Sequence, residues 1–274
     1  MLYRLWQDIA VFDERFSRFK KDSELTKVNL SAGSKTVVTP QFLELLEAAQ
    51  YFAALGEGYF NPFVLPAVQR LGYVGSLYPS KNQLPIDYTH CRVAEMNELE
   101  TGTGWVKLPL NTALDFGGIG KGFLADKLAD TLSNIPGYWL SIGGDIVAKN
   151  APDHTPWRIA IQNAQSLAED VGYCLHKGNS RFAVATSGLV RTVQDRLQPH
   201  CIDPHTSLPP KGDTQAVSAF AKTGVAAEVS ATVALLGGEV MLSKLLEHSV
   251  AESFIVQSKS GSIRERGKKV MIEG

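Results

Sequence analysis

Residues 114–132 read LDFGGIGKGFLADKLADTL, and this stretch determines much of the fold and chemistry expected of the chain. A short apolar run leads into a glycine cluster, which is followed by apolar residues at helical spacing: Phe123, Leu124, Leu128 and Leu132. Glycines let backbone approach a ligand closely, and a helix N-terminus offers free amides to phosphate. The cluster therefore predicts either a phosphate-binding turn or a tight turn that packs a helix, since its spacing matches neither common nucleotide-binding glycine motif.

Helices are predicted on the N-terminal side of this stretch. Apolar residues recur at helical spacing near the start of the chain: Leu2, Leu5, Trp6, Ile9, Phe12 and Phe16. A second helix is predicted to begin at Thr39-Pro40, because threonine caps free amides and proline suits a first turn. Its apolar face would comprise Phe42, Leu45, Leu46, Ala49 and Phe52.

Strands are predicted on the C-terminal side, after short, broken strand-like pieces at about residues 70–110. The strand-like runs are WLSIGGDIVA (139–148), WRIAIQNA (157–164) and RFAVATSG (181–188). Helices follow at about 226–236 and 239–247, and FIVQSKSGSI (254–263) predicts a hairpin. With no repeat or clear linker, the pattern predicts one α+β unit over residues 1–274.

Composition narrows the functional classes. The 274 residues include 27 basic and 28 acidic side chains, a balance that argues against a nucleic-acid surface. No stretch of the sequence reads as long and apolar enough to span a bilayer, and there is no signal peptide and no cysteine near the start that could carry a lipid. The three scattered cysteines suggest neither a disulfide framework nor a zinc site. A cytoplasmic protein fits best, unless the chain is the trimmed form of a secreted one.

Three further motifs carry polar chemistry, and each has a structural alternative. Gly143-Gly144-Asp145 follows an apolar strand, where it forms a turn or brings backbone close to a ligand. His200 precedes an Asp-Pro turn and is either a proton acceptor or a solvated loop histidine. Glu228 and Thr232 share a helix face, as a pair of oxygen ligands suited to magnesium or as an ordinary capping or surface pair.

Taken together and in order, the motifs resemble the FAD:protein FMN transferase family, also called the ApbE family. The resemblance rests on these segments: SRFKKDSELTKVN (17–29), EGYFNP (57–62), LDFGGIGKGF (114–123), IGGDI (142–146), HCIDPHTSLP (200–209) and AEVSAT (227–232). It runs from about residue 10 to the C-terminus and implies a T-fold-related α+β unit of mixed or antiparallel sheets with packed helices.

The resemblance also implies site residues. Positions that match the family's flavin and dinucleotide contacts are Phe19, Gly58, Tyr59, Phe60, Gly117, Phe123 and Ile202. The family's metal ligands correspond to the Gly120 carbonyl and the side chains of Glu228 and Thr232, and His200 matches the histidine proposed to activate the acceptor. The implied reaction is magnesium-dependent transfer of FMN from FAD to a Thr or Ser hydroxyl of a target flavoprotein, with release of AMP.

The chain departs from the family pattern in four places. Glu228 replaces the metal-site aspartate, Asn61 replaces the aspartate of the early F-D-P segment, and Ser207 replaces a glycine. The family's N-terminal strand, with its Met-Gly-Thr flavin contact, has no counterpart in this sequence. Two alternatives remain beside the transferase. One is a magnesium-dependent FAD pyrophosphatase, which would share the metal and FAD ligands and use water as acceptor. The other is a catalytically degenerate FAD-binding protein, in which the departures have disabled the metal site.

Overall fold

The computed structural model describes residues 1–272 except 73–85, 150–155, 167, 177–179 and 194–195. Contacts along the chain divide it into two compact units. The first unit comprises residues 1–120 and 191–209, and the second comprises residues 121–190 and 210–274. The α+β class is confirmed, because helices and antiparallel sheets occur together; the expectation of one domain over residues 1–274 stays a prediction.

The first unit is mainly helical. Its helices are α1 (Leu2–Phe16), α2 (Glu24–Leu30), α3 (Pro40–Leu55), α4 (Leu65–Arg70) and the 3-10 turns η1 (Pro62–Val64) and η2 (Met96–Glu98). A small antiparallel sheet, in the order β1-β3-β2, is formed by β1 (Thr36–Val37), β2 (Glu100–Gly102) and β3 (Trp105–Lys107). The strand-like pieces expected between residues 70 and 110 therefore include β2 and β3, and part of that range lies outside the described residues.

The predicted start of α3 is confirmed. The Thr39 hydroxyl accepts a hydrogen bond from the Phe42 amide at 3.3 Å and donates one to Glu24 at 2.8 Å. These bonds satisfy a free amide at the helix start and hold it against the start of α2. Four of the five residues predicted on the apolar face are buried, and Phe52 is half-buried.

The second unit contains most of the strands. Its six-stranded antiparallel sheet, in the order β13-β12-β11-β8-β5-β4, is formed by β4 (Tyr138–Ile142), β5 (Asp145–Lys149), β8 (Arg181–Gly188), β11 (Thr214–Ala221), β12 (Ser253–Ser258) and β13 (Ile263–Gly267). A three-stranded sheet, in the order β14-β7-β6, is formed by β6 (Trp157–Gln162), β7 (Asp170–His176) and β14 (Met271–Ile272). β9 (Val190–Val193) and β10 (Arg196–Pro199) form a separate two-stranded sheet. The chain passes from the second unit to the first after Val190, at the start of β9.

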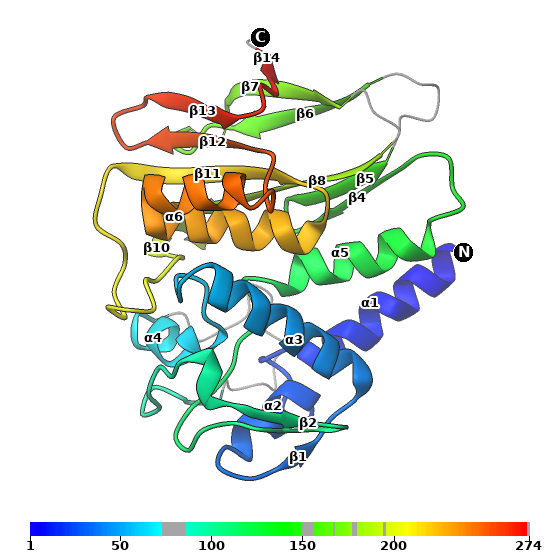
Figure 1. Ribbon diagram of the computed structural model, residues 1–274, viewed down its shortest axis with the longest axis vertical. Coiled ribbons are helices and arrows are strands. Elements are labelled where there is room, and N and C mark those ends of the chain that lie inside the picture. Colours follow the sequence, from blue (N-terminus) through cyan, green and yellow to red (C-terminus); the bar gives the residue numbers. More distant parts are fainter. Residues whose placement is uncertain (73–85, 150–155, 167, 177–179, 194–195, 273–274) are drawn as a thin grey trace. The chain divides into compact units, whose positions relative to one another are not determined.

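The second unit is layered. Buried side chains of the three-stranded sheet, including Ile159 and Ile161, form one core with Phe182, Val184 and Ile255 of the larger sheet. Helix α6 (Gly224–Glu247) packs along β8 and β11 (Figure 1). Helix α5 (Gly120–Thr131) also belongs to this unit, apart from its first residue. The large sheet thus positions α6, which carries Glu228 and Thr232.

Helix α6 unites the two C-terminal helices that the sequence predicts. The boundary expected between residues 236 and 239 corresponds to Gly238, whose backbone is non-helical at φ 63° and ψ −152°. A positive φ of this kind favours glycine. The prediction that no stretch is long and apolar enough to cross a membrane is wrong for α6 by length and composition. However, 61% of its most apolar window is buried within the protein, as in the core helix of a globular fold.

Candidate functional site

The candidate metal site depends on a close crossing of α5 and α6. A Cβ atom built on Gly122 would lie 2.4 Å from the carbonyl carbon of Gly224, and one on Gly224 would lie 2.6 Å from the Gly122 oxygen. The two backbones are therefore in direct contact, and only glycine fits at either position. The glycine cluster acts here as a packing turn, which was one of its two predicted roles.

Asp126 of α5 holds the start of α6 in place. Its carboxylate accepts hydrogen bonds from the amides of Gly224 at 2.8 Å and Val225 at 3.0 Å. Burial raises the pKa of Asp126, although both amide bonds act to lower it. The bonds satisfy two of the free amides at the α6 N-terminus and fix where the first turns of that helix lie.

Glu228 lies one turn into α6 and is buried, with 3% of its surface exposed. Its Oε2 accepts a hydrogen bond from the Gly122 amide at 2.7 Å. Its Oε1 forms an ion pair with the Lys121 ammonium at 3.0 Å. Burial raises the pKa of Glu228 to about 7, against the opposing effect of Lys121.

Lys121 links Glu228 to a second buried carboxylate, Asp145. The lysine ammonium forms an ion pair with Asp145 Oδ2, and Asp145 is 6% exposed. Burial alone would lower the pKa of Lys121, but the Glu228 and Asp145 carboxylates together raise it above its ordinary value. The Lys121 side chain itself is 39% exposed, so a flexible cation bridges two buried anions from the solvent side.

Asp145 owes its position to a tight hairpin between β4 and β5. Gly143 and Gly144 form the turn with φ angles of 61° and 95°, which favour glycine. A Cβ on Gly143 would lie 3.1 Å from Lys121 Cδ, so this glycine also leaves room for the lysine stem. The Gly-Gly-Asp motif is thus a turn that places a carboxylate beside Lys121.

Thr232 lies one helical turn beyond Glu228. Its hydroxyl is 2.8 Å from the Ser187 hydroxyl of β8 and 3.4 Å from the backbone carbonyl of Glu228. The oxygens gathered in this part of the unit are hard donors of the kind that bind magnesium. Among the described residues, no group of three or more His, Cys, Asp or Glu side chains is arranged to hold a metal ion, so any such site combines carboxylates with other oxygens.

The first unit gathers the residues predicted to contact flavin. Gly58 has a φ of 80°, and a Cβ there would lie 3.1 Å from His205 Nε2. The Tyr59 ring meets the His205 ring edge-to-face with centroids 4.7 Å apart. Phe60 is buried, and a Cβ on Gly118 would lie 3.4 Å from its ring. The EGYFNP segment therefore packs against both the turn motif and the glycine cluster.

His205 holds these segments together. Its Nε2 lies 3.0 Å from the Glu57 carbonyl and its Nδ1 lies 3.1 Å from Asp203. The predicted Asp-Pro turn is confirmed by the bridge between Asp203 and Leu208. His205 could not be predicted from the sequence, because its contacts with Glu57 and Tyr59 join segments almost 150 residues apart.

Phe19 is connected to the glycine cluster through charged neighbours. The Arg18 guanidinium lies 4.7 Å from the Phe19 ring centroid and pairs with Asp115 at 3.5 Å. Asp115 in turn accepts a hydrogen bond from the Gly117 amide at 3.1 Å. Phe19 is half-buried.

The remaining predicted site residues differ in exposure. Ile202 is 5% exposed in the first unit, and Phe123 is 4% exposed in the second, where the Lys127 ammonium lies 5.3 Å from its ring centroid. His200 is exposed and follows β10 directly. Gly120 is the first residue of α5, and its amide donates a hydrogen bond to the Phe116 carbonyl at 2.7 Å.

Two of the departures from the family pattern have a local structural role. Asn61 is buried; it accepts a hydrogen bond from the Phe63 amide at 2.9 Å and donates one to the Ala94 carbonyl at 2.8 Å. The donated bond is one that an ionised aspartate could not make. Ser207 adopts φ 58°, the left-handed region where the family's glycine would carry less strain.

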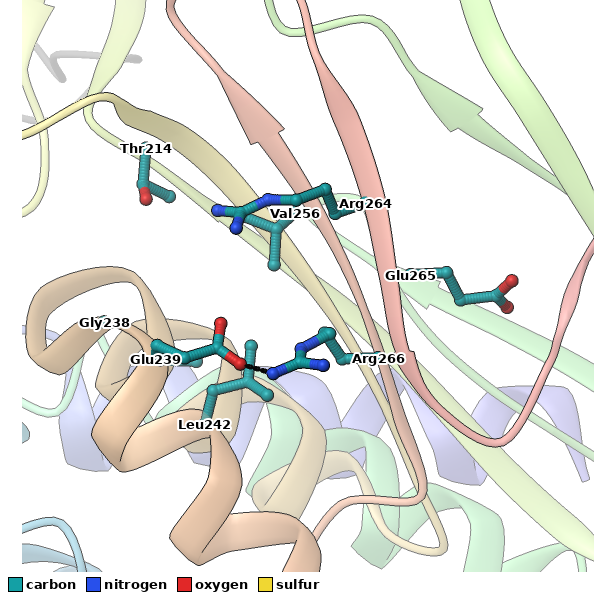
Figure 2. Close-up of a pocket in the computed structure, with 9 residues that line it drawn as sticks. Thr214, Gly238, Glu239, Leu242, Val256, Arg264, Glu265 and Arg266 are labelled. Atoms are coloured by element: carbon teal, nitrogen blue, oxygen red, sulfur yellow. Dashed lines mark ion pairs between the residues drawn. The ribbon is translucent and has the colours of Figure 1, made fainter.

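A separate pocket of about 570 Å³ lies in the second unit beside the break in α6 (Figure 2). Leu242 and Val256 contribute apolar surface, and Glu239 forms an ion pair with Arg266 across the opening. None of the predicted site residues lines this pocket.

Lys121, Gly122 and Asp145 were not predicted to meet Glu228, although the motifs that contain them were recognised. The contact between Lys121 and Asp145 spans 24 positions, and the contact between Gly122 and Glu228 spans 106. A local periodic pattern in the sequence cannot predict contacts between residues so far apart. The only signal in the sequence was the ordered presence of the motifs themselves.

Comparison with known proteins identifies the family. Residues 3–255 match the sequence model of the ApbE family. The chain is 30% identical to an FAD:protein FMN transferase of Vibrio cholerae, over 83% of this chain and 70% of that protein. It is 28% identical to an FAD:protein FMN transferase of Treponema pallidum, over 86% of this chain and 71% of that protein. The fold matches the ApbE protein of Thermotoga maritima with a TM-score of 0.80 at 21% identity, covering 97% of this chain and 88% of the other. The chain belongs to the ApbE family.

Proposed function

We propose that this protein is an FAD:protein FMN transferase that acts on a Thr or Ser hydroxyl of a target flavoprotein. The acceptor oxygen forms a bond to the FMN-side phosphorus of FAD, and the bond from that phosphorus to the bridging oxygen breaks. AMP leaves with the bridging oxygen, and the acceptor proton passes to the protein and then to solvent. Relatives of this chain that bear the name FAD:protein FMN transferase support the assignment.

The observation that carries the metal dependence is the buried carboxylate cluster. Glu228 and Asp145 are two buried carboxylates that share one partner cation, the Lys121 ammonium. Buried carboxylates are costly unless cations or donors compensate them, and a single ammonium serves both here, which favours a further cation. Hard oxygens suit magnesium, so Glu228 and Thr232 would hold the ion together with the Gly120 carbonyl. Bound there, magnesium would supply charge neutralisation at the pyrophosphate.

The other residues divide the remaining tasks. Phe19 and the segment Gly58 to Phe60 would hold the flavin, with Gly117, Phe123 and Ile202 contributing to dinucleotide binding. His200 would accept the proton of the attacking hydroxyl. Its exposure supports this role, because the acceptor is the side chain of another protein and must reach the base from solvent.

The test is to incubate the protein with FAD, magnesium and a candidate acceptor flavoprotein, and then to weigh the acceptor by mass spectrometry. We expect the acceptor to gain the mass of FMN less one water, together with one AMP per modified acceptor. An acceptor variant with Ala in place of its Thr or Ser is the matched control. AMP formed at the same rate without acceptor would identify an FAD pyrophosphatase. Bound, intact FAD with no AMP would identify a flavin-binding protein.

A further inference from the structure

Lys121 occupies a central place between the two buried carboxylates of the second unit. Its ammonium contacts Asp145 Oδ2 and lies 3.0 Å from Glu228 Oε1. The carboxylate side chains are 9% and 4% exposed, whereas the lysine side chain is 39% exposed. Two anions that are withdrawn from water are therefore bridged by a cation that keeps contact with it.

We propose that Lys121 is a displaceable internal cation: its ammonium neutralises Asp145 and Glu228 until magnesium binds, and then moves out of the site. The inference rests on the magnesium dependence of the proposed function. It assigns Lys121 a positioning role, because the lysine acts on the carboxylates that receive the ion.

Charge explains why the ammonium lies between the two carboxylates. Two ionised carboxylates buried close together repel each other and lose their hydration, which is unfavourable without a nearby cation. The single ammonium removes one of the two negative charges and leaves the cluster attractive to a further cation. Magnesium, with two positive charges, compensates both carboxylates and makes the ammonium redundant.

Geometry explains why the lysine must leave. Glu228 Oε2 is engaged by the Gly122 amide, so Oε1 is the oxygen left for a metal ion, and Oε1 is also the atom that faces the ammonium. A magnesium ion and an ammonium at the same oxygen would repel each other at short range. The lysine is attached by a flexible four-carbon stem, and Gly143 leaves that stem free of a side-chain contact on one side.

A displaced ammonium has a natural partner in the proposed reaction. Lys121 is the second residue of α5 and belongs to the glycine cluster, so its stem extends from a helix start that favours anions. A pyrophosphate bound near that start would attract the released ammonium. The pyrophosphate would pair with the ammonium that magnesium displaces, and magnesium would pair with the carboxylates that the ammonium leaves. Binding of each ligand would therefore favour binding of the other.

The experiment compares magnesium binding by calorimetry in the FAD-free parent, Lys121→Met and the control Lys107→Met. Lys107 also pairs with a carboxylate, Glu100 at 2.6 Å, but this pair lies on the surface of the first unit. We expect Lys121→Met to bind magnesium at least about tenfold more tightly than the parent, since the ion no longer has to displace an ammonium. We expect Lys121→Met to melt at a lower temperature without magnesium and to gain more from its addition, whereas Lys107→Met should bind like the parent.

A second measurement uses the parent alone, in case Lys121→Met does not fold. Amine-directed labelling followed by mass spectrometry should modify Lys121 several-fold faster when magnesium is present, with Lys107 as an internal reference. The inference is wrong, and the proposed function stands, if magnesium leaves the labelling of Lys121 unchanged. The same conclusion follows if the parent binds magnesium and a folded Lys121→Met binds it no more tightly. If neither protein binds magnesium, the metal dependence of the proposed function fails, and the inference fails with it. Binding by Lys121→Met alone would support the inference in its strongest form.

Discussion

Replacing Glu228 by glutamine tests whether this carboxylate is buried at an energetic cost. Burial raises its pKa from the ordinary 4.5 to about 7. The folded protein therefore binds the proton more tightly than the unfolded chain does. The resulting stabilisation is fully present below about pH 4.5 and is lost as the pH rises to about 7. At about 1.4 kcal/mol per pKa unit, the parent should lose about 3 kcal/mol of unfolding free energy over that range.

Glutamine is the suitable replacement because it keeps the shape of the side chain. Its carbonyl oxygen can still accept the hydrogen bond from the Gly122 amide, and Lys121 keeps its ion pair with Asp145. The side-chain amide does not titrate, so the pH dependence of this position disappears while other titrating groups remain in both proteins.

The assay is urea unfolding of both proteins at intervals from about pH 4 to pH 8 in the presence of a chelator. We expect Glu228→Gln to gain on the parent by about 3 kcal/mol between the two ends of this range. Two parallel stability curves would show that Glu228 titrates at an ordinary pKa in the folded protein. The account of the buried carboxylate cluster would then be wrong.

Four further substitutions test the remaining structural assignments. Gly122→Ala should lower the unfolding free energy by about 1–3 kcal/mol in urea titrations, because the new Cβ meets the backbone of Gly224; an unchanged value would contradict the close crossing. His205→Ala removes contacts that hold two loops together and should lower the melting temperature and weaken FAD binding in the same protein, whereas a change in neither would show that the loops do not depend on it. Phe19→Ala should weaken FAD binding about tenfold by flavin fluorescence while leaving the circular dichroism spectrum unchanged, and equal affinity would remove Phe19 from the flavin site. His200→Ala should slow transfer by a factor of about 10² to 10⁴ at saturating FAD with FAD affinity retained, and transfer at the parent rate would leave it a loop residue.

The sequence predicts those parts of the fold that neighbouring residues determine. The start of α3 follows from a threonine cap and a proline, and the hairpin of β12 and β13 follows from two short polar-flanked strands. The break in α6 coincides with Gly238, which lies at the boundary expected between two helices. In each case the deciding interactions lie within a few residues of one another, so a local pattern contains the information.

The site is less predictable because its contacts are distant in the sequence. Glu228 and Thr232 were expected to share a helix face, and they do. The other contacts of Glu228 are made with Lys121 and Gly122, more than 100 residues away. These contacts depend on a crossing that two glycines allow, and a glycine in a sequence does not reveal which backbone it will meet.

The crossing also bears on the presence of glutamate where the family has aspartate. A longer side chain could be accommodated by a helix that lies farther from the glycine cluster. The helices instead touch at Gly122 and Gly224, and the backbone contact fixes their separation. From this position the Glu228 carboxylate contacts two partners, the Gly122 amide at 2.7 Å and the Lys121 ammonium at 3.0 Å. The Gly122 amide is part of a rigid helix start and cannot move away from Glu228, whereas the Lys121 side chain can. A second cation that reaches Glu228 would therefore compete with Lys121. The glutamate at position 228 and the proposed displacement of Lys121 are therefore parts of one explanation.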